Sequence, residues 1–80
     1  MSDQELLAVF GRILGDLLSD ESVVLTMQTR RQDVPNWDSF AYVNFIVAAE
    51  IELGIKFKVA DIESFGSVGA IVAKAREMLR

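Results

Sequence analysis

A serine follows an aspartate directly at Asp38-Ser39, and this pair is where the sequence most plainly offers chemistry. Ser39 could begin a helix, act as a nucleophile, or serve as a handle for an attached group. A catalytic serine needs a base within hydrogen-bond reach and a further group that orients this base. Because the chain has no histidine, the nearest candidates are Lys56 and Lys58, which lie beyond the helix expected after Asp38, at its far end from Ser39. A nucleophilic role for Ser39 is therefore disfavoured.

Other kinds of catalytic and metal site are missing from the sequence as well. The absence of cysteine excludes disulfides, thiolate metal ligands and a cysteine nucleophile. No Gly-x-Ser-x-Gly elbow, phosphate-binding glycine loop or metal-spaced cluster occurs. The paired carboxylates Asp20-Glu21 and Glu50-x-Glu52 have the character of solvated surface charge. We therefore expect no catalytic residue, no metal site and no intrinsic enzyme activity.

The bulk composition favours one small domain over residues 1–80, since 51% of the residues are apolar and can form one core. Charges interrupt the apolar runs too often for a membrane span, and no secretory signal precedes them. The formal net charge of −4 disfavours binding to nucleic-acid phosphates. We expect a cytoplasmic protein with neither a membrane nor a nucleic acid as partner, and a monomer, because no spare apolar stripe is evident.

The sequence pattern around Ser39 predicts an all-α four-helix bundle with one short helix, and these helices must position Ser39. The first helix is expected from Asp3 to Leu18, because Ser2-Asp3-Gln4-Glu5 has the form of a capping box. Apolar residues then recur at three- and four-residue steps, which is typical of one buried helical face. They are Leu6, Val9, Phe10, Ile13, Leu14 and Leu17.

No period holds over residues 19–37, and we expect an ordered loop that crosses the domain. A connection of this length is often functional, or it contains a short helical turn. Arg30-Arg31 should face water. The residues expected to anchor the loop in the core are Val23, Val24, Leu25 and Met27.

The second helix is expected to follow Asp38, a favoured N-cap. Trp37 and Tyr42 fit a hydrophobic staple across the start of this helix. Gly54 stands where a left-handed residue closes a helix, with Ile55 placed for the usual apolar contact. A turn should then lead into a short helix near residues 60–64. Ser67 is the expected N-cap of the last helix, whose buried stripe comprises Val68, Ile71, Val72, Ala75 and Leu79.

An Asp-Ser pair at a helix start is a weak signal alone, because both residue types are common there for capping reasons. The surroundings add to it. Asp38-Ser39-Phe40, after a long loop and before an amphipathic helix, resembles the Asp-Ser-Leu signature of acyl carrier proteins. "VNFIVAAEIELGIKF" is similar to the second helix of that family with its closing Gly-Ile stretch, and "DIESFGSVGAIVAKA" to its third helix and the opening of its fourth. The resemblance covers nearly the whole chain.

The resemblance implies that Ser39 carries 4′-phosphopantetheine, added by a separate phosphopantetheinyl transferase. The thiol-ended arm would hold an acyl or aminoacyl group as a thioester, loaded by a ligase and presented to downstream acyl-processing enzymes. By the same resemblance, Asp38 would help the transferase and its magnesium engage the serine, in addition to capping the helix. A phosphodiester on the first helical turn also meets free backbone amides and the positive end of the dipole.

The second helix departs from the family in its charge. Carboxylates that many members carry two, five and twelve residues after the serine are replaced by Ala41, Asn44 and Ile51, while Glu50 is kept. So neutral a surface implies weak electrostatic steering and more apolar docking. We expect a dedicated lipid, polyketide or secondary-metabolite pathway rather than general fatty-acid synthesis. The expected docking residues are Trp37, Phe40, Ala41, Asn44, Val47, Glu50 and Ile51, with Trp37 alternatively serving only as the staple.

Three alternatives stay open. Asn36-Trp37-Asp38-Ser39 is closer to acyl carriers than to the Gly-Gly-His-Ser or Gly-Gly-Asp-Ser of many aminoacyl carriers, which discriminates only modestly. Val47, Ala48 and Ala49 either leave room for a carried chain or simply permit close helix packing. A helical interaction or structural subunit with a carrier-like fold that is never modified is the competing function, although such a subunit has no need of Ser39.

Overall fold

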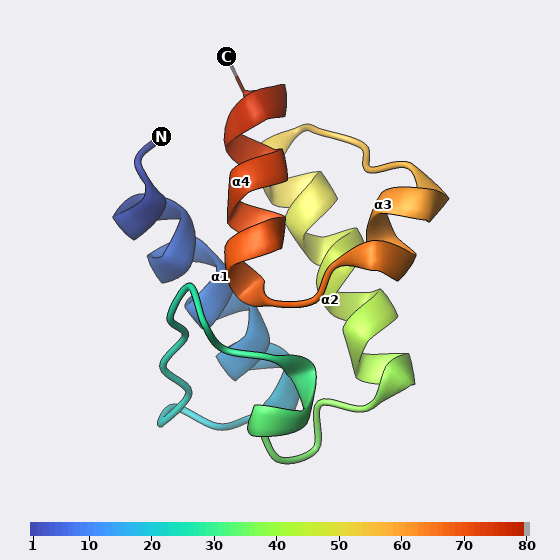
Figure 1. The fold of residues 1–80 in the computed structure, drawn as a ribbon. Coiled ribbons are helices and arrows are strands. Elements are labelled where there is room, and N and C mark those ends of the chain that lie inside the picture. Colours follow the sequence, from blue (N-terminus) through green and yellow to red (C-terminus); the bar gives the residue numbers. More distant parts are fainter. Residues whose placement is uncertain (80) are drawn as a thin grey trace.

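The computed structural model describes residues 1–79, and within them the chain forms four α-helices and no strand. The helices are α1 (Asp3–Leu18), α2 (Ser39–Leu53), α3 (Val59–Ser64) and α4 (Val68–Met78), with a short 3-10 helix at Arg31–Asp33. The expected all-α bundle, with one short helix and a long loop after the first helix, is confirmed. The start of α1 and the end of α4 lie at the same end of the bundle, and the long loop crosses the opposite end before entering α2 (Figure 1).

The first helix begins and ends as the sequence predicts. The Glu5 amide donates to the Ser2 hydroxyl at 3.2 Å, and the Ser2 amide donates to the Glu5 carboxylate at 2.9 Å. These bonds from the Ser2 backbone and side chain hold the pKa of Glu5 below its usual range. Leu17, in the last turn of α1, is the one member of the predicted stripe that is exposed, at 40%, whereas Leu18 beside it packs against the core.

Aromatic contacts in the core join α1, α2 and the end of the long loop. Phe10 on α1 meets Phe45 on α2 edge to face at a centroid distance of 5.6 Å, and Phe45 meets Trp37 in the same manner at 5.2 Å. Burying each such side chain contributes about 1.5–3 kcal/mol to folding. The buried core comprises Leu6, Phe10, Ile13, Leu14, Leu25, Trp37, Phe45, Ile46, Ala49, Phe57, Val68, Ile71, Val72 and Ala75.

The long loop is fixed to the start of α4 by main-chain hydrogen bonds. The amides of Val68 and Gly69 donate to the carbonyls of Thr29 and Met27 at 2.7 and 2.9 Å. A Cβ at Gly69 would lie 2.5 Å from the Met27 carbonyl oxygen, so this close approach requires glycine. The loop is therefore ordered, as expected, and reaches α2 by a defined path.

The anchoring residues of the loop are only partly those predicted. Leu25 is buried, and Val23 and Met27 pack against the core at partial burial. Val24 is 80% exposed, so its prediction as an anchor was wrong. In this extended stretch successive side chains point to opposite sides, and Val24 takes the solvent side between Val23 and Leu25.

The remaining helix ends follow the sequence closely. Gly54 adopts a left-handed conformation with φ of 67°, and the Ile55 amide donates to the Glu50 carbonyl at 3.1 Å. The third helix begins at Val59, one residue before the expected stretch. The Ser67 hydroxyl accepts from the Ala70 amide at 3.3 Å and caps α4 as predicted.

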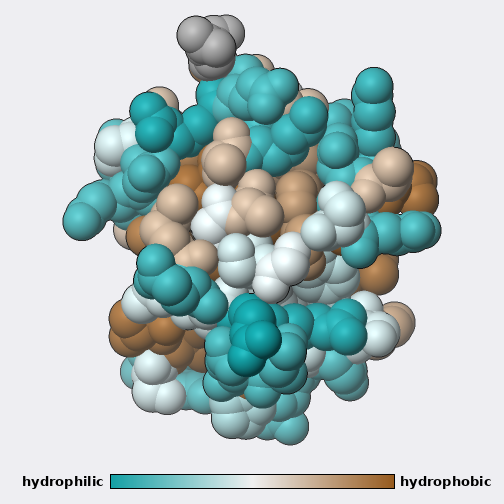
Figure 2. All heavy atoms as spheres, in the orientation of Figure 1, coloured by the Kyte–Doolittle hydropathy of each residue, from teal (hydrophilic) through white to brown (hydrophobic). Residues whose placement is uncertain are grey.

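Within residues 1–79 no helix is both long enough and apolar enough to cross a bilayer. The face seen in Figure 2 is bordered by hydrophilic residues, with paler and hydrophobic residues gathered between them over α4.

Candidate functional site

Ser39 is the first residue of α2, and its side chain is exposed to solvent. The residue before it, Asp38, accepts a 2.8 Å hydrogen bond from the Ala41 amide through its Oδ1 atom, which is the predicted N-cap. Among residues 1–79 the Ser39 hydroxyl has no hydrogen-bond partner, so it is not needed for the local fold. The Ser39 and Phe40 amides lie at the helix start, where main-chain donors have no carbonyl to pair with inside the helix. The hydroxyl is therefore accessible and stands in a region that favours a negative group.

A tight turn directs the chain into this helix start. Asn36 has a φ of 69°, a left-handed conformation that asparagine tolerates better than most residues, and the Trp37 amide donates to the Val34 carbonyl at 3.3 Å. The turn sends the Trp37 side chain inward, where it is only 4% exposed and lies 6.1 Å from the ring of Tyr42. The predicted staple is confirmed. The ring is packed in the core, which favours the alternative that Trp37 serves as the staple rather than as a contact for partner enzymes.

A hollow of about 580 Å³ opens directly beside Ser39. Its walls come from the loop before α2, from α2 and α3, and from the segment that leads into α4. Trp37, Tyr42 and Phe65 give it an aromatic lining. Its polar and charged lining residues are Arg30, Arg31, Gln32, Ser39, Glu63 and Ser67.

Tyr42 connects three parts of this hollow. Its hydroxyl donates to the Ile62 carbonyl at 2.8 Å and so links α2 to α3. Its ring lies under the guanidinium of Arg31, whose central carbon is 5.5 Å from the ring centroid. Burial raises the pKa of Tyr42, and the nearby charge of Arg31 opposes this with a smaller lowering. The expectation that Arg30-Arg31 face water is confirmed, whereas the contact of Arg31 with Tyr42 was not predicted from the sequence.

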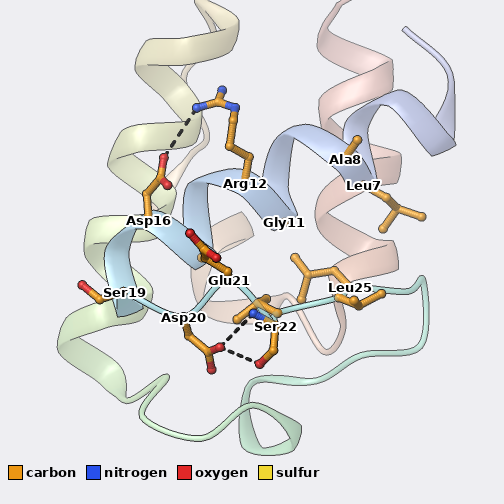
Figure 3. A pocket seen from close by; sticks show the side chains of 13 residues that line it. Leu7, Ala8, Gly11, Arg12, Asp16, Ser19, Asp20, Glu21, Ser22 and Leu25 are labelled. Carbon is orange, nitrogen blue, oxygen red and sulfur yellow. Dashed lines mark hydrogen bonds and ion pairs between the residues drawn. The ribbon is translucent and has the colours of Figure 1, made fainter.

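A second, larger hollow of about 1120 Å³ lies between α1 and the loop segment after it, and shares no lining residue with the first (Figure 3). Three of its charged side chains, those of Arg12, Asp16 and Asp20, are engaged with neighbouring groups. Arg12 pairs with Asp16 at 3.9 Å and with Glu52 at 3.0 Å. Asp20 accepts from the hydroxyl and the amide of Ser22, which lowers its pKa. The candidate site is therefore the hollow beside Ser39.

An apolar stripe runs along the outer face of α2 from the Ser39 end. Phe40, Val43, Val47 and Ile51 are exposed at 78%, 55%, 47% and 77%, and their spacing places them on one helical face. We call these four residues the α2 stripe. Val43 was not among the expected docking residues, although it lies three residues after Phe40 and four before Val47. The argument that no spare apolar stripe exists was wrong, since α2 is apolar on more than the face it buries.

The other expected docking residues are less accessible. Ala41 and Asn44 are partly buried, and Ala49 is packed into the core, which favours the close-packing interpretation of the small residues on α2. The Glu50 carboxylate accepts a 2.8 Å hydrogen bond from the Phe57 amide, so it stabilises the segment between α2 and α3. Within residues 1–79 no group of three or more acidic side chains could hold a metal ion.

Comparison with known proteins identifies a solved structure with a similar fold. No family model and no curated protein sequence matches the chain. The chain is similar to a holo acyl carrier protein from Geobacter metallireducens, whose structure was determined in solution by NMR. The two share 30% sequence identity with a TM-score of 0.85, over 92% of this chain and 85% of the other.

Proposed function

The chain belongs to the acyl carrier protein family, and we propose that it acts as a carrier whose attachment point is Ser39. The observation that carries this proposal is the exposed Ser39 hydroxyl on the first turn of α2, at the edge of a hollow of about 580 Å³. No other serine of the described chain combines an exposed hydroxyl at the first position of a long helix with such a hollow.

The residues around Ser39 fit a phosphopantetheine arm. The helix start supplies unpaired main-chain donors for the phosphate. The indole Nε1 of Trp37 is buried without a hydrogen-bond partner among residues 1–79, and Trp37 lines the same hollow. A buried donor of this kind favours an occupant that brings an acceptor. The neighbouring solved structure is of a holo protein, which agrees with this fit.

The chain's own residues have distinct roles in this proposal. This chain has no cysteine and therefore no thiol of its own. When bound, the arm supplies a terminal thiol that holds an acyl or aminoacyl group as a thioester. In loading, Ser39 Oγ gives up its proton to the transferase and bonds to the phosphorus beside the pantetheine part of coenzyme A, whose nucleotide part leaves. Asp38 uses Oδ1 to cap the helix. Its other oxygen is then available to the transferase and its magnesium.

We further propose that partner enzymes dock on the α2 stripe. Phe40, Val47 and Ile51 are exposed next to Ser39 or further along the same face, and the first turn of α2 has no acidic residue after Asp38. Contacts of this kind depend on apolar burial and gain little from charge steering. The partners would be a phosphopantetheinyl transferase, a loading ligase and acyl-processing enzymes of a dedicated pathway.

Mass spectrometry of the intact protein tests the proposal directly. The purified chain is incubated with coenzyme A, magnesium and a phosphopantetheinyl transferase of broad specificity. We expect a mass gain equal to one arm in the natural chain and in Ser22→Ala, which removes another exposed serine, but none in Ser39→Ala. A folded chain that stays unmodified would reject the carrier function and favour the unmodified structural subunit.

A further inference from the structure

Resting on the proposed function, we propose that Arg31, held against the ring of Tyr42, binds the phosphodiester that Ser39 would carry. The arm would then lie in the hollow beside α2 and α3 when no partner is bound. Arg31 would be a positioning residue for the arm, with no part in thioester chemistry.

The first reason is the position of the guanidinium. Ser39 and Tyr42 are three residues apart on α2, so their side chains are neighbours on the same face, with Cβ atoms about 5–6 Å apart. The Arg31 guanidinium carbon lies 5.5 Å from the Tyr42 ring centroid. All three residues line the same hollow. Tyr42 is therefore a neighbour both of the cation and of the residue that would bear the phosphate.

The second reason is that Arg31 differs from the other described arginines. Arg12, Arg30 and Arg76 each have a carboxylate within 4.0 Å, whereas Arg31 has none among residues 1–79. Arg30 is the sharpest contrast, because Asp33 accepts from its amide at 2.9 Å and lies 3.9 Å from its side chain. In Arg31 the ring contact supports the guanidinium without neutralising it.

The third reason is chemical fit. A phosphodiester offers oxygens that a planar guanidinium can bind through two parallel hydrogen bonds, and such charge-assisted bonds are stronger than neutral ones. The one carboxylate at this helix start, that of Asp38, already accepts from the Ala41 amide. Glu63 also lines the hollow, but it forms no ion pair with Arg31. The guanidinium is therefore available to an incoming anion.

Trp37 supports the direction in which the arm would run. Its indole donor is buried and unpaired among residues 1–79, and its ring forms part of the lining of the hollow. An arm held at its phosphate end by Arg31 would bring amide oxygens into this space. Trp37 is also the only tryptophan of the chain, so the fluorescence signal comes from a single ring that lines this hollow.

The test compares the natural chain with Arg31→Gln and with the matched control Arg30→Gln, each in its unmodified and its fully modified form. Phosphorus NMR reports on the environment of the phosphodiester, and tryptophan emission reports on the surroundings of Trp37. Thermal melting measures the stability gained on modification. In the modified natural chain we expect the phosphorus signal to differ from that of the same chain in denaturant, and the tryptophan emission to differ from that of the unmodified protein. In Arg31→Gln both differences should shrink. The gain in melting temperature on modification should shrink in that variant. Arg30→Gln should retain all three effects, and Arg31→Lys should restore part of them.

The outcomes separate this inference from the proposed function. If all variants accept the arm but Arg31→Gln matches the natural chain in all three measurements, the inference is wrong and the carrier function stands. If Arg30→Gln loses the effects equally, general positive charge explains them and a specific role of Arg31 is rejected. If the natural chain gains no mass at all, both proposals fail.

Discussion

The hydroxyl of Tyr42 donates a 2.8 Å hydrogen bond to the main-chain carbonyl of Ile62, twenty residues further along the chain. This bond matters because α3 has few other attachments. It has six residues, no side-chain cap from Lys58 and no fully buried side chain. It is also attached through the partly buried Ile62 side chain, which packs against the core, and through the ion pair between Asp61 and Lys74 at 3.9 Å. The wall of the hollow beside Ser39 therefore depends on Tyr42.

Removing this hydroxyl should loosen α3 while leaving the rest of the bundle intact. In Tyr42→Phe the Ile62 carbonyl loses its donor, which should lower the free energy of unfolding by about 0.5–1.5 kcal/mol. The rate of amide hydrogen exchange should increase in α3 much more than in α1. The ring remains, so the contact with Arg31 should persist. Equal acceleration in both helices would contradict a local role for this bond.

The same hydroxyl makes stability depend on alkaline pH. Burial raises the pKa of Tyr42 above its usual value near 10, and Arg31 only partly opposes this. Because the unfolded chain then loses the proton at a lower pH than the folded chain, stability should be full below pH 10. It should fall as the pH rises through the folded value. Tyr42 is the only tyrosine, so ultraviolet absorbance of the tyrosinate follows it directly. Tyr42→Phe should lack this part of the loss of stability at alkaline pH. If the absorbance titration of Tyr42 in the folded chain had its midpoint below that of a free tyrosine, the pKa would be lowered and the prediction would be wrong.

The helix starts were predictable because each depends on residues close in the chain. Ser2, Asp38 and Ser67 each accept from the amide three residues later, so the acceptor and the donor lie within one short stretch. Ser39 followed from the same local pattern, as the residue after the cap. The left-handed Gly54 is a local matter too.

Contacts between distant segments could not be predicted in the same way. The inward turn of Trp37 depends on Phe45, eight residues away, and the contact of Arg31 with Tyr42 requires the loop to fold back over α2. On α2 the difficulty is different. Apolar residues occur at nearly every angle around this helix, so its periodicity does not say which face the core will cover. Phe40, Val47 and Ile51 were expected to contact partners because of the family resemblance, but their union with Val43 in one exposed stripe became evident only in the structure.

Substitutions of Asp38 and Ser39 should have different effects: the loss of the Asp38 side chain should lower stability, whereas the loss of the Ser39 hydroxyl should abolish loading. Asp38→Ala removes the acceptor of the Ala41 amide and should lower stability by about 1 kcal/mol. This corresponds to roughly 4–8 °C in melting temperature for a domain of this size. Asp38→Asn keeps an acceptor and should stay near the natural stability, yet be loaded more slowly because the charge is gone. Ser39→Ala should melt nearly as the natural chain does and never be loaded. If Ser39→Ala melted lower than Asp38→Ala, cap and attachment site would have to be reassigned.

Glu50 should matter for folding more than its neighbour Glu52. Its carboxylate accepts from the partly buried Phe57 amide, seven residues away, and Glu50→Ala would leave that donor unpaired at a cost of about 1–3 kcal/mol. Glu50→Gln retains an acceptor and should lose less. The control is Glu52→Ala, which breaks only the exposed pair with Arg12 and should cost about 0–1 kcal/mol. Denaturant unfolding measures all three, and equal losses at both glutamates would reject the assigned role.

The α2 stripe makes a prediction about partner choice. A ketosynthase of general fatty-acid synthesis, which relies on basic patches, should elongate a thioester on this carrier slowly, because Phe40 and Ile51 offer it no charge. The double variant Asn44→Glu with Ile51→Glu should be elongated faster, and the gain should disappear at high salt, since exposed charges are screened. Val24→Glu adds a carboxylate at a position that is 80% exposed on the loop after α1, and should give no gain. Ordinary elongation rates with the natural chain would mean that charge on this face does not select the partner, and the dedicated pathway would lose its main support.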